Sequence, residues 1–377
     1  MDGSVKVPFI DLVELHAPLE EDLMAAVREV IQSGRFILGP KVTELETWVA
    51  DLTGAKHAVG VSSGTDALLA ALMGLDVGPG DTVITTDFSF AATAEVIARL
   101  GARPRFVDIE ADGFNLDVDQ VAVALDDTVK AVVPVHLFGR MADMRRLVDL
   151  CGDVPVIEDA AQALGASRDG LKAGSAGTMG CISFFPTKNL GGLGDGGMVT
   201  TNDRALEETL RVVRAHGGRT KDRHERLGGN FRLDALHAAL LLVKAPHLAQ
   251  WTEQRRRNAR LYQELFEGKT LPVTLPTPDR DDDLSVWNQF VISVPGRDEL
   301  RRYLASRGVP SLVYYATPFH LEPCFASLGH RVGDFPRAEL AAGRVLALPI
   351  HPGLRGEQIE YVVKCVAQFY EQEFSGS

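Results

Sequence analysis

The stretch VPVIEDAAQALGAS at residues 154–167 and the stretch GTMGCISFFPTKNLGGLGDGGMV at residues 177–199 together decide the fold. Two apolar runs of strand length, Val154–Ile157 and Cys181–Phe185, each end in polar residues, and a glycine-rich loop follows the second run. Side chains at the carboxyl ends of strands in α/β sheets point into the crevice where ligands bind. We therefore expect one site that contains Asp159, Gln162, Ser183 and Lys188.

The lysine and the carboxylate of this site suit one cofactor. Pyridoxal 5'-phosphate (PLP) forms an imine with a lysine and carries a positively charged ring nitrogen. Lys188 would form the imine, because a partly desolvated amine loses its proton more readily and attacks the aldehyde. Asp159 would bind the ring nitrogen and keep it protonated, and Gln162, three positions on, would reach the phenolate oxygen. The residues alone leave simpler interpretations open: a surface lysine, a helix N-cap and a polar side chain packed in a turn.

A second motif predicts where the phosphate of the cofactor binds. Ser62-Ser63-Gly64-Thr65 leads directly into Asp66–Leu75, an apolar segment of helical length. The N-terminus of a helix binds phosphate well, because its free N–H groups and its dipole both face the anion. Gly64 and Thr65 are therefore candidates for the phosphate site, although plain N-capping also explains the pattern.

The sequence EDAAQALGA, followed by SFFPTKNLGGLGDGG, resembles the lysine region of the PLP-dependent nucleotide-sugar aminotransferases, the DegT/DnrJ/StrS family. The resemblance covers nearly the whole chain. Further motifs in the family's order are GRFILGP (34–40), SSGTDAL (62–68), PVHLFG (134–139), GGNFRLDALHAALL (228–241) and LPIHP (348–352). It implies an α/β fold of fold-type I, with a seven-stranded, mostly parallel sheet that has one antiparallel strand and is covered by helices, plus a smaller C-terminal α+β domain.

The resemblance also implies roles for residues outside the lysine region. Phe90, in DFSFAAT, would stack on the pyridine ring, and Ser183 would bind the cofactor phosphate. Asn230, in GGNFRLD, would cross a dimer interface to the phosphate of the neighbouring subunit. From the residues alone, Phe90 also suits a core position and Asn230 a turn.

A rim of aromatic, hydroxyl and basic groups is expected around the substrate. By resemblance, the rim residues are Arg35, Phe36, Arg232, Tyr314, Tyr315 and His320. The chain departs from the family at two places. His237 stands where the family often has glutamine, and Tyr314-Tyr315-Ala316 stands where it commonly has His-Tyr-Pro. A tyrosine is uncharged near neutrality, so the family's usual substrate is not implied at this spot.

From residue 58 onward, short apolar runs alternate with helical segments, which predicts a mostly parallel sheet with both faces covered. Pro246 would kink or split a long helical stretch at residues 233–266. We expect a large PLP-binding domain at residues 1–250 and a small C-terminal domain at residues 251–377. The expected strands are Ala58–Val61, Thr82–Thr85, Arg105–Val107, Ala131–Val135, Val154–Ile157, Cys181–Phe185 and Met198–Thr200.

The composition is that of an ordinary globular protein, with 377 residues of which 45% are hydrophobic and 24% charged. The net charge of −12 argues against a general nucleic-acid binder. Cys151, Cys181, Cys324 and Cys365 lie far apart without a CxxC pair, so neither a disulfide framework nor a metal site is expected. We find no apolar run suited to a signal peptide or a membrane span, and we expect a cytoplasmic protein with no membrane partner.

The residues and the resemblance together predict a homodimeric PLP-dependent aminotransferase with shared active sites. It would take an amino group from L-glutamate, leaving 2-oxoglutarate and the pyridoxamine phosphate form of the cofactor, and pass the group to a nucleotide-linked keto-sugar. The related dehydratases have histidine in place of Lys188, which argues against dehydration. A keto-cyclitol substrate stays open, as does a regulatory protein that binds the cofactor without turnover. The nucleotide, the sugar and the C3 or C4 position of the keto group also stay open.

Overall fold

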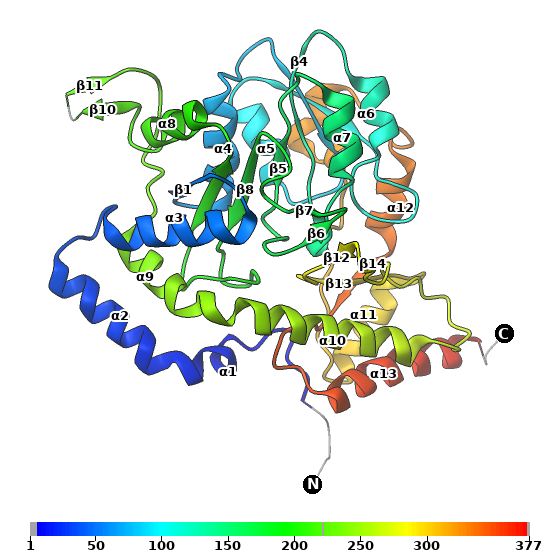
Figure 1. Ribbon diagram of the computed structural model, residues 1–377. Helices are drawn as coiled ribbons and strands as arrows, with labels where there is room; N and C mark the ends of the chain where they lie inside the picture. Colours follow the sequence, from blue (N-terminus) through cyan, green and yellow to red (C-terminus); the bar gives the residue numbers. More distant parts are fainter. Residues whose placement is uncertain (1–5, 221, 375–377) are drawn as a thin grey trace.

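A computed structural model describes residues 6–220 and 222–374, and its centre is a seven-stranded sheet (Figure 1). The strand order is β1-β9-β8-β5-β4-β2-β3, because bridges at Val132–Val156 and Val135–Asp159 join a four-stranded part to a three-stranded part. The strands of this sheet are β1 (His57–Val61), β2 (Thr82–Thr86), β3 (Arg103–Val107), β4 (Val129–Val133), β5 (Ile157–Asp159), β8 (Met179–Ser183) and β9 (Gly197–Thr201).

β9 is the antiparallel strand of this mixed sheet. Its Val199 pairs with Val59 of β1 and with Cys181 of β8, and both pairings are antiparallel. The other neighbouring strands of the described sheet run parallel. The expected mostly parallel sheet is therefore confirmed. One strand starts later than expected: β5 begins at Ile157, because Pro155 has no N–H group to donate to a ladder.

The remaining elements surround this sheet and build the C-terminal part of the chain (Figure 1). The α-helices are α1 (Leu12–His16), α2 (Glu20–Ser33), α3 (Pro40–Thr53), α4 (Gly64–Gly74), α5 (Ala92–Arg99), α6 (Val118–Ala124), α7 (Met144–Cys151), α8 (Arg204–Val213), α9 (Ala235–Lys244), α10 (Leu248–Phe266), α11 (Arg297–Ser306), α12 (Pro336–Arg344) and α13 (Gly356–Phe374). The other strands are β6 (Ser167–Arg168), β7 (Leu171–Lys172), β10 (Gly218–Thr220), β11 (Arg223–His224), β12 (Asp283–Leu284), β13 (Phe290–Ser293) and β14 (Val345–Leu348).

Pro246 splits the long helical stretch, as the sequence predicts. α9 ends at Lys244, a 3₁₀ turn contains the proline, and α10 begins at Leu248. α10 then passes from one hydrophobic core to another. Its Trp251 packs with residues of α2 and α9, whereas its Tyr262 belongs to the C-terminal core. The domain division between residues 250 and 251 stays a prediction.

The C-terminal core forms around the antiparallel pair β13–β14 and the helices α10, α11 and α13. The N-terminal segment lies against it, because Gln358 Nε2 donates to Lys6 O at 2.7 Å and Val7 is buried there. In the described part of the chain, no helix is both long enough and apolar enough to cross a membrane. The apolar stripe expected on α13 is buried: Ile359, Val362, Val363, Val366 and Phe369.

Glu158, the neighbour of Asp159 on β5, holds a turn against the sheet. Its side chain is fully buried, and it accepts three backbone N–H groups from residues 174–177 at 2.8–2.9 Å. His136 Nε2 is a fourth donor at 2.8 Å, since His136 Nδ1 accepts the N–H of Ala142. Every donor in this cluster would lose its partner without the carboxylate.

We expect Glu158→Ala to destabilise the protein by about 3–5 kcal/mol, because several buried donors would be left unpaired. Urea unfolding of the cofactor-free protein, followed by circular dichroism, measures the loss. The matched control is Glu253→Ala, which breaks an exposed ion pair with Arg260 and should cost at most about 1 kcal/mol. Equal unfolding midpoints for the two variants would contradict this account.

Candidate active site

Lys188 lies in the turn directly after β8. Its N–H bonds to Phe185 O at 2.8 Å, which tightens the turn, and its side chain is partly buried. Loss of surrounding water lowers the pKa of Lys188 to about 8, against the opposing effect of the Asp159 charge. Roughly a tenth of this amine is therefore unprotonated at pH 7, far more than for an ordinary lysine, and the unprotonated form is the nucleophile.

Asp159 ends β5, where it pairs with Cys181 of β8 and bridges Val135. The side chain is 5% exposed, and burial raises the pKa of its carboxyl. Thr93 Oγ1 donates to Oδ2 at 2.7 Å and the Ala161 N–H donates to Oδ1 at 3.2 Å. Such a buried carboxylate fits the protonated ring nitrogen of PLP, which would supply the positive charge that it lacks.

The predicted phosphate site is a narrow cradle between α4 and β8. α4 begins at Gly64, with Ser63 as its N-cap. A Cβ built on Gly64 would lie 2.7 Å from Ser183 Cβ, so only glycine allows this approach. Thr65, in the first turn, is half-buried. The free N–H groups of the helix and the Ser183 hydroxyl thus lie together, and the residues fit a phosphate.

Both residues predicted to contact the ring, Phe90 and Gln162, lie next to Tyr315. Phe90 is 58% exposed, and its ring centroid is 6.3 Å from that of Tyr315. Gln162 is buried, with its Oε1 accepting the Phe138 N–H at 2.7 Å and its Nε2 donating to Tyr315 Oη at 3.1 Å. One amide hydrogen of Gln162 remains for the phenolate oxygen. Tyr315, expected on the substrate rim, therefore also orients Gln162.

Other predicted residues lie on the surface of the described chain. Arg35 and Phe36 are exposed in the loop before α3. The Ala235 N–H donates to Phe36 O at 2.9 Å and so anchors this loop. Arg232 is half-buried, and its Nε has no hydrogen-bond partner among the described residues. Asn230 is exposed next to the β10–β11 hairpin, which projects from the body of the protein (Figure 1). The role of Asn230 across a dimer stays a prediction.

His320 does not lie on an exposed rim, contrary to the expectation for it. Its side chain is fully buried, with Nδ1 2.6 Å from Asp87 Oδ2 and Nε2 3.1 Å from Glu339 Oε1. The ring also packs against Phe335, with the centroids 4.9 Å apart. These contacts attach the segment after Tyr314 and Tyr315 to the end of β2. His320 therefore fixes the position of this segment, and no face of its ring is exposed to a substrate.

The sequence interpretation missed Thr93, whose hydroxyl holds Asp159. The available signal was its place near the start of the helix that follows Phe90, since α5 begins at Ala92. That signal is weak, because threonine near the start of a helix usually has a local role.

Comparison with known proteins agrees with this geometry. A profile of the DegT/DnrJ/EryC1/StrS aminotransferase family matches residues 18–367. The chain is 48% identical to a pleiotropic regulatory protein of Geobacillus stearothermophilus, over 97% of this chain and 99% of that relative. It is 41% identical to a UDP-N-acetyl-3-dehydro-alpha-D-glucosamine 3-aminotransferase of Acidithiobacillus ferrooxidans, over 97% of this chain and 98% of that relative.

Among solved structures, DesV of S. venezuelae superposes with a TM-score of 0.94 at 40% identity, covering 97% of this chain and 99% of that chain. The fold and the site define a PLP-dependent aminotransferase of fold-type I. The chain belongs to the DegT/DnrJ/EryC1/StrS aminotransferase family.

We expect the cofactor-free protein to capture PLP covalently at a rate that rises with pH through about 8, because only the unprotonated Lys188 amine attacks the aldehyde. Asp159→Asn should move the midpoint to lower pH, since the neutral amide no longer stabilises the ammonium form. Stopped-flow absorbance between about pH 6 and 10 measures both profiles. Lys172→Ala serves as a surface control, and capture at the wild-type rate by Lys188→Ala would refute the assignment.

Proposed function

We propose that this aminotransferase acts on the keto group of a nucleotide-linked sugar, with L-glutamate as the amino donor. The observation that carries the proposal is the open side of the cofactor site, where exposed Phe90 lies near Tyr315 and Tyr314 packs edge-on against Tyr315. Aromatic faces with hydroxyl groups suit a pyranose ring, which has apolar faces and polar edges. The relative from A. ferrooxidans carries a UDP-linked 3-dehydro sugar in its name, which supports the same substrate class.

The arginines near the site support the nucleotide part of the proposal. Enzymes that take only α-amino acids commonly grip both substrate carboxylates with paired arginines. Here Arg35 is exposed on the loop before α3, and Arg232 has a buried Nε without a partner in the described chain. Both guanidinium groups would be available to the diphosphate of a nucleotide sugar.

Each residue of the site has a definite task in this transfer. When bound, PLP supplies an aldehyde that carries the amino group and a ring that accepts electrons. Asp159, oriented by Thr93 and the Ala161 N–H, holds a proton at the ring nitrogen. Lys188, with its pKa lowered to about 8, takes a proton from the donor carbon and delivers one to the acceptor carbon. Phe90 covers the face of the ring and keeps water from it.

We also propose that the active sites are shared in a homodimer. Large apolar side chains are exposed on α2, on the loop before α3 and after β11, with Ile31 and Ile37 each 60% and Leu227 88% exposed. Exposed apolar side chains of this size are typical of a surface that contacts a protein partner. Asn230 lies in the same exposed region as Leu227, next to the β10–β11 hairpin, from where it would reach a neighbouring phosphate.

A keto-cyclitol in place of the sugar remains the alternative substrate, since the rim would also accept a carbocyclic ring. The relative from G. stearothermophilus carries a regulatory name, which makes binding without turnover the alternative from another class. Bleaching of the cofactor absorbance by L-glutamate, with release of 2-oxoglutarate, separates an enzyme from such a binding protein.

We expect the pyridoxamine phosphate form of the enzyme to be reoxidised fastest by a nucleotide-linked keto-sugar, because the rim contacts the ring and the diphosphate. Single-turnover absorbance would compare UDP- and dTDP-linked 3-keto and 4-keto sugars, a keto-inositol, pyruvate and oxaloacetate. Tyr314→Phe should slow the sugar half-reaction by about tenfold and the glutamate half-reaction less, if its hydroxyl bonds to the sugar.

Tyr361→Phe is the matched control for this measurement, because its hydroxyl bonds to Arg307 O in the C-terminal part. Faster reoxidation by pyruvate or oxaloacetate than by every nucleotide sugar would rule out the proposed substrate class. The fastest reaction with the keto-inositol would favour the cyclitol alternative.

We expect Lys188→Ala and Asn230→Asp, each inactive alone, to recover activity when their subunits are exchanged. A mixed dimer has one site with both lesions and one site with neither, so equal mixing should restore about a quarter of the wild-type activity. Mass spectrometry of the native assembly would verify the exchange. Proven exchange without recovery would exclude a site that combines Lys188 of one subunit with Asn230 of the other.

A further inference from the structure

A second cavity, with a volume of about 740 Å³, lies apart from the Lys188 site. Its walls are the loop at residues 109–115, the segment at residues 274–293 and the end of α12. None of the residues predicted to hold PLP or the substrate lines it. Its size falls within the range of small-molecule sites, about 300–1,000 Å³.

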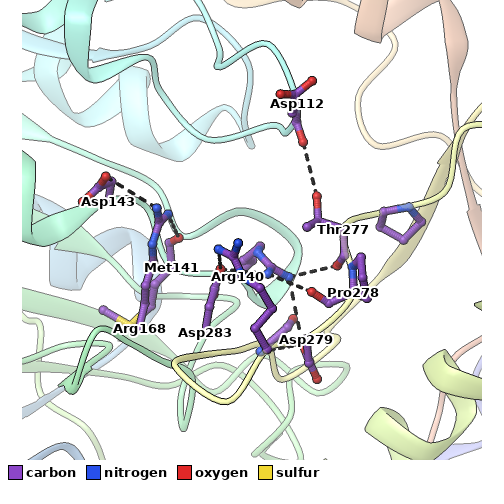
Figure 2. A network of polar contacts seen from close by, with 12 residues as sticks. Asp112, Arg140, Met141, Asp143, Arg168, Thr277, Pro278, Asp279 and Asp283 are labelled. Atoms are coloured by element: carbon purple, nitrogen blue, oxygen red, sulfur yellow. Dashed lines mark hydrogen bonds and ion pairs between the residues drawn. The ribbon is translucent and has the colours of Figure 1, made fainter.

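Arg140 holds the cavity open by tying its walls together. Its guanidinium donates to Thr277 O at 2.9 Å, to Pro278 O at 3.1 Å and to Asp283 Oδ2 at 2.8 Å (Figure 2). The Thr277 hydroxyl donates to Asp112 O at 3.3 Å and so bridges the two sides of the rim. The cavity is therefore formed before any ligand binds, which lowers the cost of binding.

Arginines outnumber acidic residues in the lining of the cavity, although most of them form ion pairs. Among the described residues that line it, five are arginines and three are acidic, while the whole chain has a net charge of −12. The guanidinium of Arg344 has no hydrogen bond or ion pair in the described structure, and the Arg280 side chain is 65% exposed. Arg344 is free to bind an anion at the rim, whereas Arg280 forms a partly exposed ion pair with Asp283 at 3.6 Å and would turn from it toward an anion. Guanidinium groups match phosphate well.

Two lining residues also carry oxygen atoms that need hydrogen-bond donors. Gln289 Oε1 and Asp283 Oδ1 are buried and have no partner in the described structure. A buried acceptor without a donor is costly, and native proteins rarely leave one without a partner.

Phe114 and Phe138 add an apolar wall to the cavity, with their rings 5.2 Å apart. A ligand that fits has amino and hydroxyl groups at one end, which donate to the two buried acceptors, and an anionic group at the other end, which binds the arginines.

We propose that this cavity is a second ligand site, which binds an amino sugar that carries a phosphate. The amino and hydroxyl groups donate to Gln289 and Asp283, the pyranose face packs on the phenylalanine wall, and the phosphate meets Arg280 and Arg344. The proposal goes beyond the transamination reaction and does not depend on its substrate.

The motif PVHLFG forms the wall between this cavity and the PLP site. Phe138 O accepts the Gln289 N–H at 3.3 Å, and the Phe138 N–H donates to Gln162 Oε1 at 2.7 Å. Gly139 has a φ of +102°, and a Cβ there would lie 2.8 Å from Asn288 N. The backbone at Gly139 therefore packs directly against the backbone at Asn288. A ligand at Gln289 therefore acts on a backbone segment that also fixes the amide of Gln162.

The test is a titration of the PLP-loaded enzyme with glucosamine 6-phosphate, followed by calorimetry and by tryptophan fluorescence, because Trp287 lines the cavity. We expect glucosamine 6-phosphate to bind about tenfold or more tighter than glucosamine or inorganic phosphate alone. Gln289→Met should weaken binding about five- to tenfold and Arg344→Gln severalfold. Matched controls outside the cavity are Gln254→Met and Arg331→Gln, which should bind as the wild type does.

Three results would overturn the proposal. The first is binding no tighter than that of glucosamine or phosphate alone. The second is unchanged affinity in both Gln289→Met and Arg344→Gln, with circular dichroism showing that they are folded. The third is loss of binding in Lys188→Ala, or competition with a nucleotide sugar at the active site, which would place the ligand in the PLP site. Retained binding in Lys188→Ala supports a separate site.

Discussion

The active site depends on a carboxylate that is buried in the central sheet. Asp159 lies at the end of β5, between β8 and the end of β4, where water cannot solvate its charge. The hydrogen bonds from Thr93 and the Ala161 N–H offset only part of the lost solvation, because burial still raises the pKa of the carboxyl. In the proposed arrangement a protonated ring nitrogen would supply the missing positive partner, so the cofactor and Asp159 would stabilise each other in their charged forms. The same burial lowers the pKa of Lys188 to about 8.

Strand geometry explains why two adjacent carboxylates have unrelated tasks. Successive side chains of a strand point to opposite faces, so Glu158 and Asp159 cannot share partners. Glu158 accepts the donors of residues 174–177 and of His136 and fixes the chain that leads into β8. Asp159 faces Thr93 and the cofactor side. One side chain thus stabilises the fold around the site, and its neighbour is the one proposed to act on the cofactor.

Local patterns allowed most of the sheet to be predicted, because apolar runs, glycines and Pro246 act on neighbouring residues. The family motifs allowed the cofactor to be predicted, and the assignment of individual residues to it stays a prediction. The contacts that were missed join distant parts of the chain. Thr93 reaches Asp159 across 66 residues, and His320 reaches Asp87 across 233. No periodicity in either segment indicates such a partner. His320 was therefore placed on the rim, although three-dimensional packing buries it between two carboxylates.

The residues proposed to hold the cofactor and those proposed to face the substrate come from different parts of the fold. Asp159 and Ser183 end strands of one sheet, whereas Phe36 and Tyr314 lie on loops that meet the sheet from outside. Loops vary with less cost to stability than strands, so substrate choice can change while the cofactor chemistry is kept. Gln162 joins the two sets, because its amide bonds to Tyr315 on one side and to the Phe138 backbone on the other. If the amide also binds the cofactor as proposed, a change at the rim or at the cavity wall would reach the ring through Gln162.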